Sequence, residues 1–158
     1  MAVGTVSSVD GDVWQLIATN TPSAVTSSTF SSVSGYKKLM ITYQIPTLSS
    51  SSLIYLRFNG DSTTGNYAGT NGLFTSAGGA RDNTRLPITS YSEAEAHGYV
   101  VIADTNKTTP KRIEDMGGRQ IGYGNGIYFG TSEISSVLVF TNTTETMTGT
   151  IKLYGIAA

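Results

Sequence analysis

The segment YKKLMITYQI, from Tyr36 to Ile45, decides the fold class because its side chains alternate between apolar and polar. A period of two places successive side chains on opposite faces of a β-strand. The apolar face carries Leu39, Ile41, Tyr43 and Ile45, the polar face carries Lys38, Thr42 and Gln44, and Met40 is the exception. Pro46 follows, and we expect it to end the strand because proline cannot donate to a ladder.

On both sides of this strand, short apolar runs separated by turn residues predict further strands. We expect them at Asp12–Thr19, Thr29–Val33, Leu53–Asn59, Arg85–Tyr91, His97–Asp104, Lys111–Met116, Gln120–Gly130, Ile134–Phe140 and Thr146–Ile156. Short irregular strands are expected between Asp61 and Arg85, since a structureless loop of that length is unusual. Pro87 restricts its strand to a sheet edge. The last two strands are expected to form a closing pair, and Ser92–His97 is the one window with helical character.

Eight to ten short strands with regularly spaced turns favour an all-β fold, a jelly-roll-like antiparallel β-sandwich. The 158 residues fit one domain. We expect that domain to span residues 12–158, after an N-terminal arm at residues 1–11. The arm is uncharged from Met1 to Val9 and rich in Ser and Val. It could add a strand to a neighbouring chain, or it could be a frayed terminus.

Composition excludes several classes of function. No cysteine is present, which removes disulfides, Cys-ligated metals and thiol nucleophiles. Only 13% of residues are charged, the net charge is −1, and no basic block would hold nucleic acid or an anionic membrane. No run of 18 apolar residues or secretory signal is visible. Hydroxyls replace the missing charges, with 19 Ser and 23 Thr. We therefore expect no enzyme activity, cofactor, metal, nucleic acid or membrane partner.

Two short motifs resemble ligand sites. Asp10-Gly11-Asp12 and Asn59-Gly60-Asp61 place oxygen ligands close together, as calcium sites do. The preferred interpretation of both is a β-turn whose Asx side chain bonds its own backbone. The glycines of Gly122–Gly126 could suggest a phosphate loop, but a strand rather than a helix follows them, so we interpret them as a hairpin turn.

Catalytic interpretations are weak. His97 is the only histidine and could act as a general base oriented by Glu95 or Asp104, but no hydroxyl is singled out as its nucleophile. A hydrogen-bonding or interface role is preferred for it. Glu93 and Glu95 are too close in sequence to straddle a glycosidic bond from opposite sides. Nine tyrosines and Trp14 could instead stack on sugars. We favour the interpretation that most of them fill the core and subunit contacts.

Several short motifs follow one another in a fixed order along the chain. The central motif is Leu56–Asp61, LRFNGD, followed by Gly65-Asn66-Tyr67. A Trp-containing strand, TFSS at Thr29–Ser32 and GYKKL at Gly35–Leu39 precede it. ISSV at Ile134–Val137 and LYGI at Leu153–Ile156 follow it. Together these motifs resemble a family of tailed-bacteriophage virion proteins of the capsid decoration, or cement, type. The order holds from about Trp14 to Ile156, and Thr75–Thr109 matches only loosely.

The resemblance implies a structural protein on the capsid surface of the virion, assembled in the host cytoplasm. Proteins of this type sit on the phage head as trimers and clamp neighbouring capsomers, so the implied partners are the major capsid protein and two further copies of the chain. The alternative is a receptor- or carbohydrate-binding tip of a tail fibre, with a host-surface glycan as partner. The candidate interface residues are Val3, Val6, Val9, Tyr67, Phe74 and His97.

Overall fold

The computed structural model describes residues 13–50, 52–72, 84–89, 94–117, 122–142 and 144–158. These residues form antiparallel strands and no helix, so none of them belongs to a helix that could cross a membrane. The eleven strands are β1 (Gln15–Asn20), β2 (Ser27–Ser31), β3 (Tyr36–Leu48), β4 (Tyr55–Phe58), β5 (Tyr67–Gly72), β6 (Leu86–Pro87), β7 (Ala96–Ala103), β8 (Lys111–Gly117), β9 (Gly122–Tyr128), β10 (Ser136–Phe140) and β11 (Met147–Ala157).

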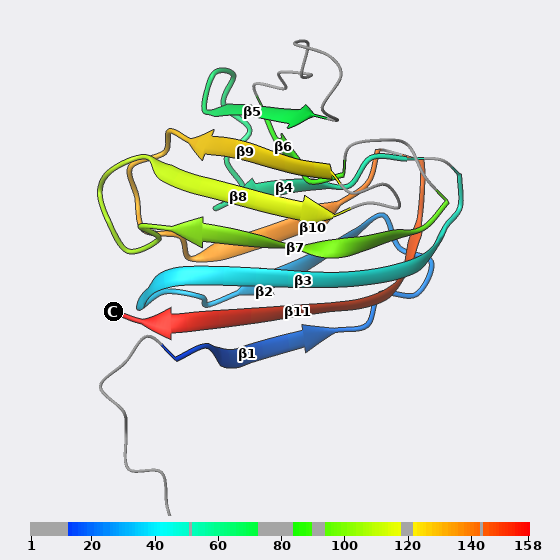
Figure 1. Cartoon of the computed structure of the whole chain (residues 1–158), viewed down its shortest axis with the longest axis horizontal. Helices are drawn as coiled ribbons and strands as arrows, with labels where there is room; N and C mark the ends of the chain where they lie inside the picture. Colours follow the sequence, from blue (N-terminus) through cyan, green and yellow to red (C-terminus); the bar gives the residue numbers. More distant parts are fainter. Residues whose placement is uncertain (1–12, 51, 73–83, 90–93, 118–121, 143) are drawn as a thin grey trace, which may run out of the picture.

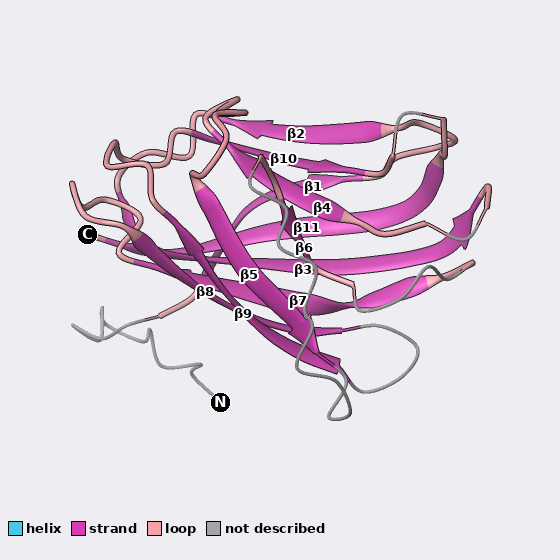
Figure 2. Cartoon of the chain, turned by 90° about the horizontal axis from the view of Figure 1, so that it is seen from above, coloured by secondary structure: helices cyan, strands magenta, loops and turns pink. Residues whose placement is uncertain are grey.

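The strands form two stacked sheets, which makes the fold the expected β-sandwich (Figures 1 and 2). The larger sheet has seven strands in the order β1-β11-β3-β7-β8-β9-β5, and the smaller has four in the order β2-β10-β4-β6. From β1 to β7 the chain changes sheet at every strand. This winding is jelly-roll-like, because strands distant in sequence become neighbours. The described residues form eleven strands rather than the expected eight to ten.

The core lies between the two sheets. It is built mainly from the inward side chains of β3, β4, β7, β10 and β11, including Leu39, Ile41, Phe58, Val100 and Leu153. The alternation in Tyr36–Ile45 predicts this correctly, because the apolar set is buried while Gln44 is exposed. The other face of the seven-stranded sheet has no layer over it within the described part of the chain.

Pro46 does not end β3, contrary to expectation. The strand continues to Leu48, and its pairing with β11 has an irregularity at this point. Gln44 pairs with Thr150 and Thr47 pairs with Thr148, so two residues of β3 face the single Gly149. The bulge places the residue without an N–H where the ladder is already interrupted, and the strand can therefore pass through it.

Two further expectations are wrong, one about the pairing of the last two strands and one about a helical window. β10 and β11 do not pair, because β10 lies between β2 and β4 while β11 lies between β1 and β3. The connection between them crosses from one sheet to the other. At its two ends, the Thr141 N–H donates to the Thr26 carbonyl oxygen and the Met147 N–H donates to the Val25 carbonyl oxygen. The window Ser92–His97 is not helical where it is described, since Ala96 already begins β7. Pairing of Ile45 with Ala96 overrides the local helix preference.

The glycines at Gly122–Gly126 are not a hairpin turn but part of β9. Gly126 pairs with Gly69 on β5, and an added Cβ at either residue would lie within 2.6 Å of Leu86 Cδ1. The missing side chains therefore make room for Leu86 of the four-stranded sheet. Pro87 lies beside Leu86 in β6, an edge strand, as expected.

Candidate functional site

The described residues line an open hollow of about 420 Å³ on the outer face of the seven-stranded sheet. We call it the outer-face hollow. It lies over β3, β7 and β11, on the face turned toward the reader in Figure 1. Its lining consists of Thr42, Tyr43, Gln44, His97, Gly98, Tyr99, Thr150, Lys152 and Tyr154. A volume of this size lies within the range of roughly 300–1,000 Å³ that is typical of small-ligand sites.

Strand register places the outward side chains of the hollow in two rows. Lys152, Thr42 and Tyr99 are paired across β11, β3 and β7. Two residues further along, Thr150, Gln44 and His97 are paired in the same way. Tyr43 points inward instead, where its hydroxyl donates to the Ile88 carbonyl oxygen at 3.0 Å. The hollow is therefore a surface whose shape is fixed by three hydrogen-bonded strands.

Several side chains of the outer-face hollow are exposed and form no hydrogen bond with other described residues. Tyr99 is 40% exposed, and Gln44, His97 and Lys152 are also exposed. Among the residues that the structure describes, none hydrogen-bonds to the side chains of Gln44, His97 or Lys152. The lining residues that the structure describes include two side chains that can carry positive charge and no carboxylate. The arrangement can offer an aromatic face and several hydrogen-bonding groups to a ligand.

The sequence-predicted interface residues divide into three groups. His97 lies in the outer-face hollow. Tyr67 is fully buried, so the expectation that it forms part of an interface is wrong. Val3, Val6, Val9 and Phe74 lie outside the described residues, as do residues 1–11 of the expected arm.

Among the described residues, no catalytic group is assembled around His97. Asp104 follows the opposite end of β7, seven residues away, which corresponds to about 23 Å along a strand. The structure describes no hydrogen bond between the His97 ring and Glu95 or Asp104, and Glu93 lies outside the described residues. His97 is thus an exposed side chain that the described structure does not pair with a carboxylate.

Tyr67 is buried because it belongs to a hydrogen-bonded group that we call the tyrosine cluster: Phe58, Asp61, Asn66, Tyr67 and Tyr128. The ring centroids of Tyr67 and Tyr128 are 4.9 Å apart, and that of Phe58 lies 5.3 Å from that of Tyr128. The Tyr67 hydroxyl accepts from the Phe58 N–H at 3.0 Å and donates to the Asp61 carbonyl oxygen at 2.9 Å. The buried Tyr67 hydroxyl therefore has hydrogen-bonding partners.

The Asp61 carboxylate joins the tyrosine cluster to the turn before it. It accepts from the Thr63 N–H at 2.9 Å, the Asn66 amide at 2.7 Å and the Tyr128 hydroxyl at 2.9 Å. Burial would raise the pKa of Asp61, but these hydrogen bonds lower it to about 2. Burial also raises the pKa of Tyr67 to about 12, and burial with the bond to Asp61 raises the pKa of Tyr128.

The Asn59-Gly60-Asp61 motif is a turn with an Asx bond, as preferred from the sequence. The Asp61 N–H donates to the Phe58 carbonyl oxygen at 2.9 Å, and Asn59 and Gly60 both have positive φ, at 54° and 66°. This is the pattern of a type I′ turn. Among the described residues no group of three His, Asp or Glu side chains could hold a metal ion. Asp10 and Asp12 lie outside them.

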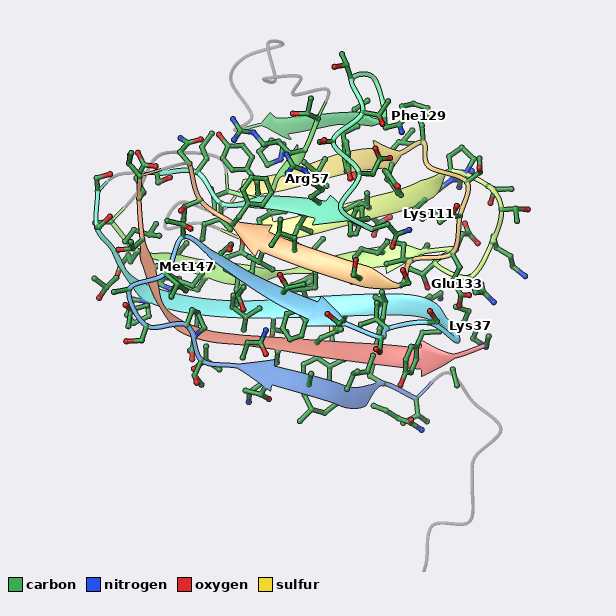
Figure 3. The ribbon with its side chains drawn as sticks, turned by 180° about the vertical axis from the view of Figure 1, so that it is seen from behind. Lys37, Arg57, Lys111, Phe129, Glu133 and Met147 are labelled. Carbon is green, nitrogen blue, oxygen red and sulfur yellow. The ribbon has the colours of Figure 1, made fainter. Side chains whose placement is uncertain are left out.

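Asn59 connects the central motif to ISSV at Ile134–Val137. Its side-chain oxygen accepts from the Ser135 N–H at 2.8 Å and the Ser136 N–H at 3.2 Å, and its amide donates to the Glu133 carbonyl oxygen at 2.8 Å. Figure 3 shows Glu133 and Lys111 toward one end of the sandwich and Met147 toward the other. The end of the sandwich near Glu133 is therefore held by side-chain bonds to backbone.

The remaining motifs also contact one another. Phe30 of TFSS pairs with Val137 of ISSV. Tyr36 of GYKKL lies so close to Gly155 of LYGI that an added Cβ would come within 2.4 Å of its ring. The residues that carry the family resemblance thus form the sandwich and its turns. They do not line the outer-face hollow, apart from Tyr154.

Lys111 is another buried polar residue with a structural explanation. Its ammonium group donates to the carbonyl oxygens of Lys107, Thr109 and Gly130, at 2.7, 2.8 and 3.2 Å. Burial lowers its pKa, and the nearby Asp104 opposes that change. All three ammonium protons have acceptors, so Lys111 joins two loops and is not offered to a ligand.

Comparison with known proteins leaves the family open. No protein-family model matches the chain, and no curated protein matches it. Among solved structures, exo-inulinase from Aspergillus awamori is similar to it with a TM-score of 0.47 and 15% sequence identity, over 92% of this chain. The chain spans 29% of the length of that enzyme.

Of the outer-face hollow, the sequence singles out His97, and it includes Tyr99 and Tyr154 only among the nine tyrosines that could stack on sugars. It does not single out Gln44 or Lys152. Part of the signal is present in the sequence, because the alternation in Tyr36–Ile45 places Thr42 and Gln44 on the polar face of that strand. What the sequence lacked was the order of strands, which places β7 and β11 on either side of β3.

Proposed function

We propose that this protein is a non-enzymatic structural component of a tailed-phage virion, a decoration protein that binds the assembled capsid. Its partners are the major capsid protein and two further copies of the chain, at the capsid surface. Support comes from the ordered motifs shared with that family and from their contacts, since residues from Phe30 to Gly155 pack together in one scaffold. Such a scaffold can be retained while its outer surfaces change.

The observation that carries this proposal is the apolar edge at β1. β1 lies at the end of the strand order and pairs only with β11 among the described strands (Figure 1). Beside and on it, Val13 is 54% and Leu16 is 56% exposed. An unpaired edge with large exposed apolar side chains is typical of a surface that another chain covers. We assign this edge to contacts with a neighbouring copy or with the capsid.

A decoration protein of this kind stabilises the capsid by mass action. Binding to the assembled lattice and not to free capsid protein lowers the free energy of the lattice state. Contacts made by apolar and hydroxyl groups depend weakly on salt, because few charges take part. The low charge content of the chain, 13%, suits that kind of contact.

The test is binding of the purified protein to capsids that lack it, followed by co-sedimentation and by the melting temperature of the capsid. We expect co-sedimentation and a higher melting temperature. Leu16→Glu should abolish both, whereas the control Ile127→Glu, which alters a 39% exposed side chain on β9, should retain them. Circular dichroism establishes that both variants fold. Failure of the unaltered protein to bind capsids contradicts the proposal.

The alternative, a receptor-binding tip of a tail fibre, predicts a different result in the same assay. Such a protein binds host cells or glycans and has no affinity for capsids. The specific observation in its favour is the outer-face hollow, which lies on β3, β7 and β11 and not at the β1 edge.

A further inference from the structure

We propose that the outer-face hollow binds an acidic saccharide, with a sugar ring against Tyr99 and a sugar carboxylate held by Lys152. This goes beyond the proposed structural function and does not depend on where the protein sits in a virion. The hollow differs from the other polar clusters of the molecule, because its side chains are not already bonded to one another.

The contrast with the four-stranded sheet makes this clear. On that sheet the Arg85 guanidinium lies 3.7 Å from the Tyr55 ring centroid, and the Arg57 guanidinium lies 4.9 Å from that of Phe140. Arg57 also donates to the Thr84 carbonyl oxygen and Arg85 to the Asn142 side chain. These guanidinium groups and aromatic rings already interact with one another. In the outer-face hollow, the Tyr99 ring and the Lys152 ammonium have no such partner among the described residues.

Tyr99 supplies the stacking surface. Its side chain is 40% exposed although it is held on the central strand β7, between β3 and β8. An aromatic face is electron-rich and attracts the positively polarised C–H groups of a pyranose ring. Tyr154, half-buried on β11, provides a second ring at the border of the hollow. A flat ligand with polar edges fits this surface better than a purely apolar one.

The surrounding polar groups match the edges of a sugar. Gln44 and His97 are paired neighbours, and Thr42 and Thr150 flank Gln44 on the same face. Together they offer hydroxyl, amide and imidazole groups, which both donate and accept hydrogen bonds. Sugar hydroxyls need partners of both kinds. Since β3, β7 and β11 fix these groups, a ligand does not have to order a loop on binding.

Charge selects the class of sugar. Among the described lining residues, Lys152 and His97 can carry positive charge, and none is an Asp or Glu. Lys152 is in the same row as Tyr99, with Thr42 between them, so the two side chains lie about two strand spacings, or roughly 10 Å, apart at the backbone. A lysine side chain can reach across that distance to the carboxylate of a uronic or sialic acid residue stacked on Tyr99.

The first experiment measures binding of the purified full chain to matched glycans by isothermal titration calorimetry. The panel contains glucuronate-, galacturonate- and sialate-containing oligosaccharides, each beside the same compound with its carboxylates reduced to hydroxymethyl groups. We expect at least one acidic compound to bind about tenfold or more tightly than its reduced counterpart, since a bond to a charged group is stronger than a neutral one. Raised salt should narrow the difference.

Variants then test the two roles, stacking of the sugar ring on Tyr99 and binding of its carboxylate by Lys152. Tyr99→Ala should weaken binding of acidic and reduced compounds alike by about tenfold or more, whereas Phe129→Ala, which removes a 43% exposed ring outside the hollow, should not. Lys152→Met should remove the preference for the acidic compound and leave the affinity for the reduced compound unchanged. Lys107→Met, at an exposed turn, is the matched control for the loss of one positive charge.

Three outcomes overturn the proposal. One is that no acidic compound of the panel binds. Another is equal affinity for acidic and reduced compounds, which would identify a neutral-sugar site instead. The third is that Phe129→Ala and Tyr99→Ala weaken binding equally, which would place the site elsewhere. Capsid binding by the same variants is measured separately, so failure here is distinguishable from failure of the decoration function.

Discussion

The tyrosine cluster and the outer-face hollow contain similar side chains in opposite situations. In the cluster, Tyr67 is fully buried and its hydroxyl bonds to backbone groups of Phe58 and Asp61. In the hollow, Tyr99 is 40% exposed and its hydroxyl forms no hydrogen bond with another described residue. The same residue type therefore stabilises the fold in one place and is offered to solvent in the other. The difference comes from the pleat, because one tyrosine points into the sandwich and the other away from it.

This difference separates residues that maintain the scaffold from those that could vary with function. The motifs that carry the family resemblance belong in part to the tyrosine cluster and otherwise to the pairing of β2 with β10 and the contact of Tyr36 with Gly155. The hollow takes its side chains from the outward positions of β3, β7 and β11. Substitutions should therefore change stability in the first region and binding in the second.

The largest expected effect comes from Tyr67→Ala. Removing a fully buried ring that packs on Phe58 and Tyr128 should cost about 3–5 kcal/mol of the free energy of unfolding, because it leaves a cavity and unpaired backbone groups. Urea unfolding followed by circular dichroism measures this. Tyr67→Phe retains the ring and tests the hydroxyl alone, and should cost about 1–3 kcal/mol. A cost near zero for both variants would show that the cluster does not stabilise the fold.

Gly126→Ala should have the next largest effect. The added Cβ would lie 2.6 Å from Leu86 Cδ1, so the sheets must move apart or Leu86 must change rotamer, at a cost of about 1–3 kcal/mol. The neighbouring Asn125→Ala, which alters an exposed side chain, is the control and should cost less than about 0.5 kcal/mol. In a Leu86→Val background the cost of the added Cβ should fall. Simple additivity of the two changes would exclude the proposed contact.

Asp61→Asn should have a smaller effect that depends on pH. The pKa of Asp61 is about 2 in the folded protein, against an ordinary value of 3.8, so its ionised form stabilises the fold above about pH 4. That contribution is lost as the pH falls from about 4 to 2. Because the carboxylate is partly exposed and solvent screens it, we expect about 1 kcal/mol.

The measurement is urea unfolding of the unaltered protein and of Asp61→Asn at intervals from pH 2 to pH 6. The difference between their free energies of unfolding should be largest at pH 6 and should approach zero near pH 2. Glu114→Gln, an exposed outer-face substitution, controls for the loss of one negative charge. If both variants gave the same curve, net charge and not the tyrosine cluster would be the cause.

The sequence predicted the fold class because alternation along Tyr36–Ile45 is a local signal that survives in the structure. It could not predict that Pro46 lies within β3, since the bulge opposite Gly149 depends on a partner strand about a hundred residues away. The expected pairing of β10 with β11 is wrong for the same reason, because the two strands lie in different sheets. A short connection suggests a hairpin, and only packing of the whole chain shows that it crosses between sheets.

The sites were predictable to a smaller extent. The Asx turn at Asn59–Asp61 depends on neighbouring residues, and the preferred interpretation of it is confirmed. The burial of Tyr67 was not predictable, because a glycine- and asparagine-rich segment looks exposed until Tyr128 and Phe58 are placed against it. The outer-face hollow was not predictable either, since its residues come from three strands that are adjacent only in the folded sheet.

The smallest effect on stability is expected for Tyr99→Ala, and this prediction tests the comparison most directly. A ring that is 40% exposed on an open sheet face contributes mainly through cross-strand contact, so its loss should cost less than about 1 kcal/mol of unfolding free energy. The same variant should lose the saccharide binding proposed for the outer-face hollow. Urea midpoints of Tyr99→Ala and Tyr67→Ala, measured side by side, give the stability comparison. A cost for Tyr99→Ala equal to that of Tyr67→Ala would mean that the exposed tyrosine also maintains the scaffold, and stability and binding could no longer be assigned to separate regions.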